Sequence, residues 1–527
     1  MEDSGRGSET TKMVLDEILL KNANSNPEKL AVVDMGTSTS CTYDELNARV
    51  NRLAHALTDA GVSKGDRVAI VQHNCLEYIE AFFSIFKIGA VLTTFDYRVA
   101  PRELLYLLND SKANTLIIGE NYLNLISPIR SEISTVRNFI CIGQGAENMQ
   151  SYNELVSTYP TTEPVANIDE NDLSTLYYTS GTTGLPKGVM MTHKNLTVAM
   201  MNMLKALPVT SEDITLHTSP FSHIAPIWPL LDHCYVGGAN VIVRGFEPKV
   251  VLEAISEHRV TTWNTVPTVI LRLIEYPELD RYDLSSLRWI GYGASPMPIE
   301  VLKKAILKLG NIFTQVYGAT ETYIVTVLPK EDHVLDGPEN KLRRLRSCGK
   351  SLDGLEVRIV NKQDKDTEPG ETGEIIVKGD SVTPGYWELP GETAKAIKQG
   401  WYYTGDLATI DEEGYIYIVD RKKEIIISGG ENVSPREVEE VIYKHPSVFE
   451  VAVIGIPDEK WVEAVKAVVV LKEGKTATEE EIIAFCKQNL ARFKAPKSVD
   501  FTDSLPKTAS GKISRKEIKD KYRVRGM

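Results

Sequence analysis

The sequence predicts an α/β protein with a large N-terminal domain of layered α/β subdomains, a β-rich subdomain and a small, mobile α+β C-terminal domain. Three observations predict it: helix and strand patterns alternate over most of the chain, short strands with turn residues begin near Ser347, and a separate mixed pattern ends the chain. At 527 residues the chain is also too long for one simple core. We expect a disordered N-terminus at 1–12, an N-terminal domain at 13–421 with its β-rich subdomain at about 347–421, a hinge at 422–424 and a C-terminal domain at 425–527.

The composition limits the classes of partner and compartment. A net charge of -13 argues against a nucleic acid or an anionic membrane as the main partner, but nucleotides need only local positive charge. The polar N-terminus lacks the apolar segment of a secretory signal, and no apolar run reaches transmembrane length. Six scattered cysteines form no metal-binding or CxxC pattern, so we expect buried free thiols in a reducing compartment and a cytoplasmic protein. They are Cys41, Cys75, Cys141, Cys234, Cys348 and Cys486.

The first part of the chain alternates helices and strands. Residues 43–61 place apolar side chains every three or four positions, which predicts an amphipathic helix that ends at Gly61. Thr192 is a suitable N-cap for a second amphipathic helix at 192–204. Further strands are expected at 66–72, 90–96, 115–119, 138–143, 238–243 and 260–267, and further helices at 77–90, 250–258 and 299–309. Such alternation is typical of a largely parallel sheet.

The later part of the chain changes character. Residues 354–379 contain two alternating strands around a Pro/Gly turn, and residues 402–421 form another predicted hairpin. The tail 507–525 holds eight basic and two acidic residues. Most of this basic segment also fits a solvated amphipathic helix, but Lys512 precedes that helix in the turn TASGK.

Residues 177–188 (YYTSGTTGLPKG) have the composition of a phosphate-binding loop. Glycines let backbone N–H groups turn toward an anion, while hydroxyls and a lysine add donors and charge. The stretch is not a Walker A loop because Pro186 precedes Lys187, and its strand-like flanks indicate that it joins two strands. A glycine- and threonine-rich surface hairpin is the alternative. The candidate phosphate-binding residues are Thr179, Ser180, Gly181, Thr182, Thr183, Gly184 and Lys187.

Four further stretches combine turn residues with chemically active side chains. In VYGATET (316–322), a loop expected after a strand, Glu321 offers a carboxylate for Mg²⁺, although a capping Thr/Glu pair would look the same. GYGASPMP (291–298) is a Gly/Pro loop suited to close approach of a flat ligand. WYYTGDL places Asp406 at an expected strand end, where it can accept hydrogen bonds from ribose hydroxyls or simply form a turn. LPKTASGKI places Lys512 on a tight turn.

Together these stretches resemble the adenylate-forming superfamily of acyl-CoA synthetases, adenylation domains and beetle luciferases. The matches follow the family's order over nearly the whole chain: YYTSGTTGLPKG, GASPMP, VYGATET, WYYTGDL, VDRKKEIIISGGENVSP and LPKTASGK. The resemblance implies an AMP-binding N-terminal domain and a C-terminal domain that carries a catalytic lysine. It also implies two half-reactions. A carboxylate attacks the α-phosphate of ATP and releases pyrophosphate, and then a thiol, usually that of coenzyme A, displaces AMP from the acyl-AMP.

The resemblance assigns roles in the first step, where positioning and charge neutralisation dominate. Lys512 would bridge the carboxylate and the α-phosphate, Thr320 would contact the α-phosphate, and Glu321 would bind Mg²⁺. The loop from 179 to 188 would hold the β- and γ-phosphates. The adenosine would lie against Gly293, Ala294, Ser295, Tyr317, Gly318, Asp406 and Arg421.

For the second step, the family rotates the C-terminal domain. The hinge residue lies two positions after the Arg of the DR dipeptide, which corresponds to Lys423. The rotation would remove Lys512 and bring a glycine-rich segment to the site, where it leaves room for pantetheine. A Trp and a Phe contact the CoA nucleotide in related aryl-CoA ligases, although packing aromatics would give the same pattern. The implied CoA-binding residues are Ser428, Gly429, Gly430, Trp461 and Phe493.

The acyl pocket is the part of the site that the sequence identifies least clearly. SPFSHIAPIWPL resembles the family segment whose His lies beside the carboxylate, which places His223 there. A structural histidine is the alternative. The expected pocket residues are His223, Ile224, Ala225, Trp228, Tyr292 and Tyr323. Because this set contains no Lys or Arg, we expect an uncharged acyl or aryl tail rather than a dicarboxylate.

The sequence therefore predicts an ATP-dependent carboxylic acid:CoA ligase that forms AMP and acts on a fatty, alicyclic or aromatic acid, with ATP, Mg²⁺ and coenzyme A. The main alternative is an adenylation enzyme that loads a carrier-protein thiol. An amino-acid-activating enzyme is disfavoured because Asp213 and Asp232 do not sit where the ammonium partner is expected. A luciferase-like oxygenase and an inactive nucleotide-binding regulator are further alternatives. The sequence leaves a homodimer open.

Overall fold

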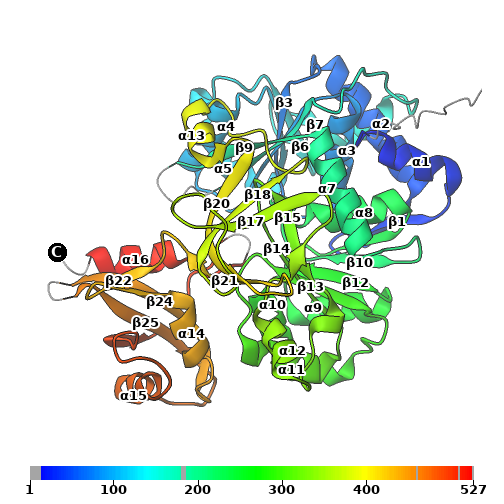
Figure 1. The fold of residues 1–527 in the computed structure, drawn as a ribbon. Coiled ribbons are helices and arrows are strands. Elements are labelled where there is room, and N and C mark those ends of the chain that lie inside the picture. The colour runs from blue at the N-terminus through cyan, green and yellow to red at the C-terminus, as the bar shows by residue number, and fades with distance from the viewer. Residues whose placement is uncertain (1–13, 180–184, 459–460, 509–510, 525–527) are drawn as a thin grey trace, which may run out of the picture. The chain divides into compact units, whose positions relative to one another are not determined.

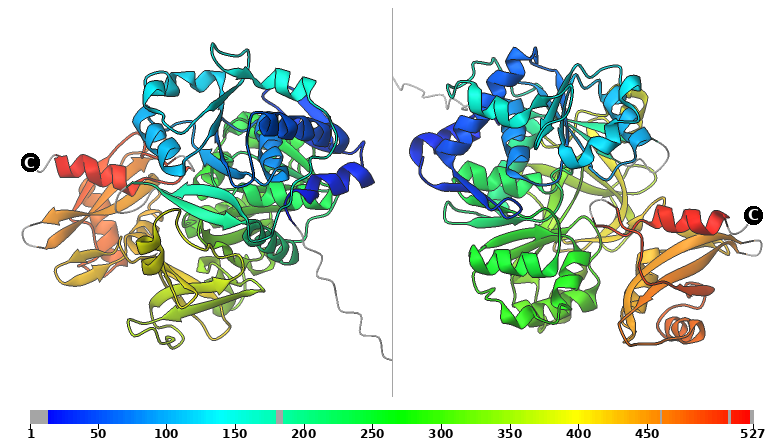
Figure 2. Two further views of the ribbon diagram at one scale, coloured as in Figure 1. Left: turned by 90° about the horizontal axis from the view of Figure 1, so that it is seen from above. Right: turned by 180° about the vertical axis from the view of Figure 1, so that it is seen from behind.

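The computed structural model describes residues 14–179, 185–458, 461–508 and 511–524. Its chain divides into two units (Figures 1 and 2). The first unit comprises Met1–Asp213, Phe221–Arg244 and Asp380–Pro390. The second comprises Ile214–Pro220, Gly245–Gly379 and Gly391–Met527.

The first unit contains helices and strands in the predicted alternation. Its helices are α1 (Glu17–Ser25), α2 (Tyr43–Asp59), α3 (Leu76–Lys87), α4 (Pro101–Ser111), α5 (Leu123–Ile126), α6 (Tyr152–Thr158), α7 (His193–Ala206) and α8 (Ile227–Val236). Its strands are β1 (Leu30–Asp34), β2 (Thr39–Thr42), β3 (Arg67–Val71), β4 (Val91–Phe95), β5 (Thr115–Gly119), β6 (Asn138–Ile142), β7 (Gln150–Ser151), β8 (Leu173–Thr179), β9 (Lys187–Thr192) and β11 (Ala239–Ile242).

A mostly parallel sheet forms the core of the first unit, in the order β7-β6-β5-β3-β4-β8-β9. The strands β3, β4 and β5 are parallel, with α3 and α4 as crossover helices, as the sequence pattern requires. The strands β8 and β9 pair antiparallel and bring Thr179 opposite Lys187. This pairing confirms that the glycine- and threonine-rich stretch joins two strands.

Local capping explains where two helices of the first unit begin. The Thr42 hydroxyl oxygen accepts a hydrogen bond from the Glu45 N–H, and the Glu45 carboxylate accepts one from the Thr42 N–H. Thr192 makes the same reciprocal arrangement with Asn195, which confirms the predicted N-cap of α7. Each cap satisfies backbone donors that the first helical turn leaves open.

The second unit holds the remaining elements. Its helices are α9 (Pro248–Glu257), α10 (Pro267–Ile274), α11 (Ile299–Leu309), α12 (Glu339–Arg343), α13 (Pro390–Ala396, which starts in the first unit), α14 (Pro435–Ile442), α15 (Glu479–Asn489) and α16 (Arg515–Val524). Its strands are β10 (Ile214–His217), β12 (Thr262–Thr265), β13 (Trp289–Gly293), β14 (Phe313–Ala319), β15 (Tyr323–Leu328), β16 (Lys350–Ser351), β17 (Leu355–Val360), β18 (Gly373–Gly379), β19 (Ile397–Lys398), β20 (Trp401–Ile410), β21 (Ile416–Arg421), β22 (Ile426–Ser428), β23 (Glu431–Val433), β24 (Val448–Asp458), β25 (Val462–Leu471) and β26 (Ser498–Phe501).

Three groups of paired strands organise the second unit. The strands β10, β12, β13 and β14 are parallel, and β15 and β16 continue them in antiparallel pairing. The strands β17 to β21 form an antiparallel sheet, which confirms the predicted β-rich region. The strands β22 to β26 form a third, small sheet near the end of the chain.

The strands are longer than predicted at three of the motifs. Asp406 was expected at a strand end, but β20 continues to Ile410 because it pairs with both β18 and β21. Tyr317 and Gly318 belong to β14 rather than to a loop, since they pair with β15. The strand β13 likewise extends to Gly293, so the expected loop starts later than its Gly/Pro content suggests.

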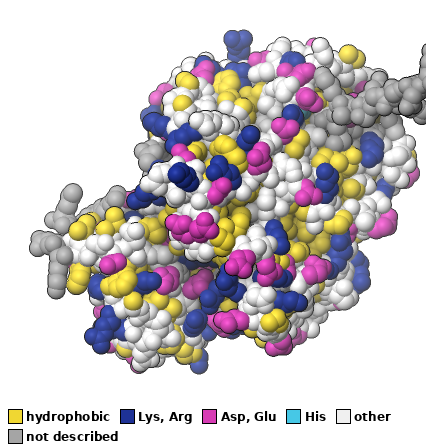
Figure 3. All heavy atoms as spheres, in the orientation of Figure 1, with side chains coloured by type: hydrophobic (Ala, Val, Ile, Leu, Met, Phe, Trp, Pro, Cys, Tyr) yellow, Lys and Arg dark blue, Asp and Glu magenta, His cyan; other side chains and the backbone are white. Residues whose placement is uncertain are grey.

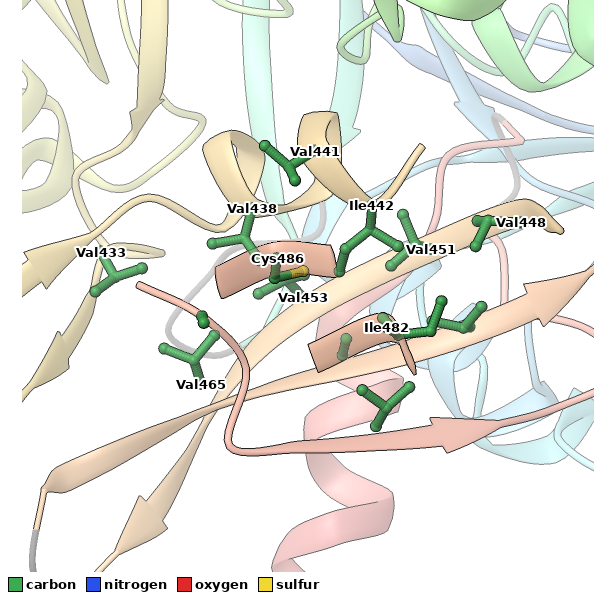
Figure 4. Packing of buried hydrophobic residues seen from close by; sticks show 14 of the residues in the cluster. Val433, Val438, Val441, Ile442, Val448, Val451, Val453, Val465, Ile482 and Cys486 are labelled. Atoms are coloured by element: carbon green, nitrogen blue, oxygen red, sulfur yellow. The ribbon is translucent and has the colours of Figure 1, made fainter. Parts of the chain in front are cut away.

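The small sheet packs its own hydrophobic core against α14 and α15 (Figure 4). Ile442 of α14 and Val451 of β24 are both fully or almost fully buried in it. Alternate residues of β24 pack on opposite faces of the sheet: Val453 belongs to this core, whereas Ile454 belongs to a second cluster that also contains Ile518 of α16. The predicted α+β pattern in this region is therefore confirmed.

The surface and the cysteines agree with the composition. On the face drawn in Figure 3, acidic and basic side chains are intermixed. All six cysteines are buried free thiols, as predicted. Among the described helices, none combines the length and the apolar character that a membrane span requires.

We predict that Ile442→Ala will destabilise the small core by about 2–4 kcal/mol because it removes a fully buried side chain. Hydrogen exchange of the β24 and β25 amides should accelerate at least about tenfold in the full chain. Ile427→Ala is the matched control, because Ile427 is 49% exposed and should change stability by less than about 0.5 kcal/mol. Equal exchange rates in the two variants would contradict the assigned core.

Candidate functional site

Asp406 is the centre of a buried polar group in the second unit. It lies in the middle of β20, is only 5% exposed, and stands opposite Arg421 of β21. The Tyr317 hydroxyl donates to Asp406 Oδ2 at 2.8 Å, and Arg421 Nε lies 3.2 Å from Oδ1. Burial raises the pKa of the Asp406 carboxyl above its usual value, against the lowering effects of Arg421 and Tyr317. The structure thus brings together three of the predicted nucleotide-binding residues.

Lys512 lies within electrostatic reach of this group. Its turn is closed by a hydrogen bond from the Thr508 N–H to the Lys512 carbonyl at 2.7 Å. The Thr268 hydroxyl of α10 donates to the Gly511 carbonyl at 2.9 Å and so anchors the turn. Burial and repulsion from Arg421 lower the pKa of Lys512 to about 8, while Asp406 acts in the opposite direction. The charges of Asp406 and Arg421 therefore both act on the predicted lysine in the folded chain.

Thr320 and Glu321 lie at the turn between β14 and β15. The Ala319 N–H donates to Thr322 Oγ1 at 3.1 Å, which helps to define this turn. Glu321 is partly exposed, and its charge is one of those that raise the pKa of Arg421. Mg²⁺ usually takes one or two carboxylates together with substrate phosphates and water, so a single carboxylate at this place fits the ion. Among the described residues, no group of three His, Cys, Asp or Glu side chains suits a metal ion.

Close backbone contacts surround the predicted adenine segment. A Cβ on Gly293 would lie 2.3 Å from the Val316 carbonyl oxygen, and one on Gly318 only 1.8 Å from that of Tyr323. Both positions therefore require glycine. Ala294 has a positive φ of 65°, and Ser295 follows in the connection to α11. Contact of this segment with adenine stays a prediction.

Two predicted acyl-pocket residues of the second unit are buried. Tyr292 is fully buried, and its hydroxyl makes a 2.9 Å hydrogen bond with His333 Nε2. Tyr323 is 3% exposed and has a positive φ of 59°. Positive φ is uncommon for a bulky residue, so the turn before β15 holds Tyr323 in a costly conformation. Their role toward an acyl group stays a prediction.

The remaining acyl-pocket residues lie at the start of α8 in the first unit. The His223 side chain is 34% exposed, and Nε2 lies 3.8 Å from Asp96 Oδ2. Ile224 and Trp228 are buried, whereas Ala225 is exposed.

Asp232, on the same helix as Trp228, is a buried carboxyl. The Trp228 indole N–H donates to Asp232 Oδ2 at 2.5 Å. Burial raises the pKa of Asp232 well above its usual value, although the indole lowers it. Burial therefore disfavours the ionised form of Asp232.

The phosphate-loop residues fall partly outside the described chain. Thr179 ends β8 and Lys187 begins β9, with Lys187 Nζ 5.2 Å from the centroid of the Tyr386 ring. Gly188 lies against Tyr178, whose Cζ would be 3.2 Å from an added Cβ. The predicted residues Ser180, Gly181, Thr182, Thr183 and Gly184 lie outside the described residues.

Four of the predicted CoA residues lie at two adjacent turns of the small sheet, whereas Phe493 lies in the connection between α15 and β26. The Gly429 N–H donates to the Trp461 carbonyl at 2.8 Å, and an added Cβ on Gly429 would lie 2.8 Å from the Trp461 ring. Ser428 is buried, Gly430 has a positive φ of 86°, and Phe493 is 36% exposed. In this conformation the Trp461 ring leaves no room for a side chain at position 429, which explains why a glycine is needed there.

The predicted hinge is a tight turn after β21. The Glu424 N–H donates to the Arg421 carbonyl at 2.8 Å, and the Lys422 N–H donates to the Gly405 carbonyl at 2.9 Å. Lys423 is exposed at this turn. The hinge assignment stays a prediction.

Arg515 is a site-adjacent residue that the sequence argument did not single out. It forms an ion pair with Glu424, and its Nη2 lies 2.7 Å from Glu439 Oε2 on α14. The Val453 N–H also donates to Glu439, at 2.8 Å. Arg515 follows Lys512 by three positions and lies in the basic tail, which was the only signal in the sequence. It ties the start of α16 to the predicted hinge and to α14.

The comparisons with known proteins agree with this arrangement. The model of the family described as AMP-binding enzyme matches residues 19–387, and that of the AMP-binding enzyme C-terminal domain matches residues 437–512. A feruloyl-CoA synthase of an Amycolatopsis species is 36% identical over 95% of this chain and 98% of its own. The long-chain-fatty-acid–CoA ligase FadD13 of Mycobacterium tuberculosis is 34% identical over 96% and 98%, respectively.

The solved structures lead to the same family. The crystal structure of the anthranilate CoA ligase AuaEII with anthranoyl-AMP superposes with a TM-score of 0.89 at 27% identity, covering 97% of both chains. The fold and the motifs define an adenylate-forming enzyme. The chain belongs to the AMP-binding enzyme family.

We predict that competitive acetylation followed by mass spectrometry will give Lys512 an apparent pKa of about 8 in the protein without ligand. The cause is burial together with the charge of Arg421. Lys194 is the matched control, because its hydrogen bond to Asp380 raises its pKa above the usual value. An equal apparent pKa for Lys512 and Lys194 would contradict the assigned surroundings of Lys512.

Proposed function

We propose that this protein is an ATP-dependent carboxylic acid–CoA ligase that forms an acyl-AMP and pyrophosphate, and then acyl-CoA and AMP. The observation that carries the proposal is that Tyr317 and Arg421 converge on the buried carboxyl of Asp406 and that the charges of Asp406 and Arg421 act on Lys512. This placement supports a nucleotide site with one mobile cation near the reacting centre. The family and the names of the two relatives support the reaction class.

In the first step, we propose that Lys512 brings together the two anions that react, which are the carboxylate of the acid and the α-phosphate of ATP. Its pKa of about 8 leaves the amine largely charged at pH 7. A compact ammonium can contact an oxygen of the acid and one of the α-phosphate together, which reduces their repulsion. Thr320 would contribute a hydroxyl to the α-phosphate. The carboxylate oxygen then forms the new bond to phosphorus, and pyrophosphate leaves.

Asp406 and Arg421 would hold the ribose. Each oxygen of the Asp406 carboxylate already accepts from one protein group, and each keeps capacity for a further donor. The two ribose hydroxyls are suitable donors. Because the Asp406 carboxyl is already buried in the folded chain, binding of the ribose would add little further desolvation of this group.

We propose that Glu321 holds Mg²⁺ when ATP is bound. The ion would neutralise phosphate charge there. Glu321 suits this task because it is partly exposed at a turn. Its negative charge also raises the pKa of Arg421.

In the second step, we propose rotation of the C-terminal region about Lys423. Movement of the turn that contains Lys512 would break the bond from Thr268 to Gly511. The segment from Ser428 to Gly430, with Trp461 and Phe493, would then serve the CoA thiol and its nucleotide. The network of Arg515 supports movement of this region as one body.

The acid is proposed to have an uncharged tail. Ile224 and Trp228 are buried, and burial raises the pKa of the Asp232 carboxyl well above its usual value. The two relatives are named for feruloyl and long-chain fatty acyl groups, which also lack a second carboxylate. The buried thiols support a reducing compartment, and we propose the cytoplasm.

A carrier-protein ligase is the second candidate, because it would use the same adenylation residues. The exposure of Phe493 beside Lys494 favours free CoA, whose nucleotide needs an aromatic and a cation. Loss of Trp461 should weaken the use of CoA but hardly affect transfer to a carrier protein.

We predict that AMP forms only when ATP, Mg²⁺, CoA and a suitable acid are all present. The acid panel should contain fatty acids of increasing length, cinnamic acids and succinate, and AMP is measured by chromatography. The rate of AMP formation with acids that have an uncharged tail should exceed the rate with succinate at least about tenfold. The second carboxylate of succinate would lose its water without gaining a cation as partner. Absence of acid-dependent AMP and of pyrophosphate exchange with every acid would contradict the proposed enzyme class.

We predict that Lys512→Ala will slow acyl-AMP formation by about 10²–10³-fold, because it removes the charge that meets both anions. Thioester formation from supplied acyl-AMP should change less than about threefold. Lys187→Ala is the comparison variant and should slow adenylation by only about tenfold, since Lys187 is assigned to the leaving phosphates. A larger loss in Lys187→Ala than in Lys512→Ala would refute this division of roles.

A further inference from the structure

Asp96 follows β4 in the first unit, and both of its carboxylate oxygens accept hydrogen bonds from Arg98. Oδ1 accepts hydrogen bonds from the Arg98 backbone N–H and from Nε, both at 2.8 Å. Oδ2 accepts from Arg98 Nη2 at 2.8 Å and faces Ser222 Oγ at 3.5 Å and His223 Nε2 at 3.8 Å. The Arg98 guanidinium thus engages both oxygens of Asp96, and Oδ2 in addition faces His223.

The segment that carries His223 is held at the ends of two parallel strands. The Thr94 hydroxyl of β4 donates to the Ser222 carbonyl at 2.9 Å. The Phe221 N–H donates to Asn74 Oδ1, just after β3, at 2.9 Å. These two bonds hold the backbone next to His223 close to Asp96, so the orientation of the imidazole depends on the side-chain torsions of His223.

The charge on Asp96 is maintained by its surroundings. Burial raises the pKa of the Asp96 carboxyl, but Arg98 and His223 outweigh it and lower the pKa overall. Among the described residues, the phenols of Tyr78 and Tyr122 also sense the charge of Asp96, and they are uncharged at neutral pH because burial raises their pKa values. Asp96 is thus a carboxylate that faces one imidazole.

An anion beside an imidazole favours the protonated ring and orients its N–H. Nε2 of His223 is buried on the side of Asp96, while about a third of the side chain remains exposed. The exposed part of the ring is what an acid substrate can meet. A positive ring held in one orientation would attract and align the substrate carboxylate before it attacks the phosphate.

We propose that Asp96 is a positioning residue for the acid: it holds His223 protonated and oriented, and Arg98 keeps Asp96 ionised. This inference rests on the proposed function and on the family resemblance, which implies that His223 lies beside the substrate carboxylate. It extends that function because Asp96 acts only through His223 and touches no substrate. The alternative is that Asp96 merely stabilises the turn after β4.

A double-mutant cycle separates the two possibilities. Acid-dependent exchange of pyrophosphate into ATP is measured for the wild type, Asp96→Asn, His223→Gln and the double variant. Asp96→Asn should raise the KM for the acid about tenfold and leave the KM for ATP within about twofold. In the His223→Gln background, Asp96→Asn should change the acid KM by less than about twofold. Equal factors in both backgrounds, or no change in the wild-type background, would overturn the proposal.

A second measurement requires no activity. Diethyl pyrocarbonate modifies unprotonated imidazole, and mass spectrometry reports the rate at each histidine. Asp96→Asn should accelerate the reaction of His223 at least about threefold at neutral pH, while His55 and His258 keep their wild-type rates. An unchanged rate at His223 overturns the proposal even if every acid in the panel fails. Failure of the panel with the expected change at His223 rejects only the proposed function.

Two controls exclude indirect effects. Asp283→Asn removes an exposed carboxylate that pairs with Arg259 at 2.7 Å, and it should change neither readout. Circular dichroism and thermal unfolding check the fold of each variant. If Asp96→Asn does not fold, Asp96→Glu replaces it in the same cycle, because the longer carboxylate is displaced from His223 by about 1.5 Å but keeps its charge. Purely additive effects of Asp96→Glu and His223→Gln would then overturn the proposal.

Discussion

A buried carboxylate must have partners, and this constraint shapes the second unit. Asp406 lies in the middle of a strand, where burial disfavours its charge. Tyr317 reaches it from β14 and Arg421 from β21, so two sheets contribute one polar group. The field of this group also acts on Lys512, which Arg421 repels and Asp406 attracts. The charge of the lysine therefore depends on where its turn is docked.

The docking of that turn and the state of Lys512 are coupled. In the described conformation, Thr268 holds Gly511, and the lysine is partly desolvated beside a guanidinium. If the turn moved into solvent, both causes of the lowered pKa would disappear, and the amine would take up a proton more readily. A substrate anion beside Lys512 would also raise the pKa of the amine. Binding of the acid or of ATP should thus strengthen the charge that the chemistry needs.

The ion pairs of Arg515 connect this turn with the rest of the C-terminal region. Its guanidinium meets Glu424 next to the predicted hinge and Glu439 on α14, and burial of Glu439 makes loss of this partner costly. In the first unit, Asp96 and Arg98 form another carboxylate–guanidinium pair, which faces His223. In both places a guanidinium offsets the charge of a largely buried carboxylate, which is Glu439 in one pair and Asp96 in the other.

The sequence by itself determined the local elements and the order of the motifs. Apolar periodicity and caps located α2 and α7, and the six motifs indicated the family, because these signals lie within short stretches. The tertiary structure alone decided how far β20 extends, that Tyr317 meets Asp406, and that Asp96 faces His223. Such contacts join residues far apart in the chain. Strand length and side-chain pairing depend on which neighbours the folded backbone supplies, and no local pattern encodes them.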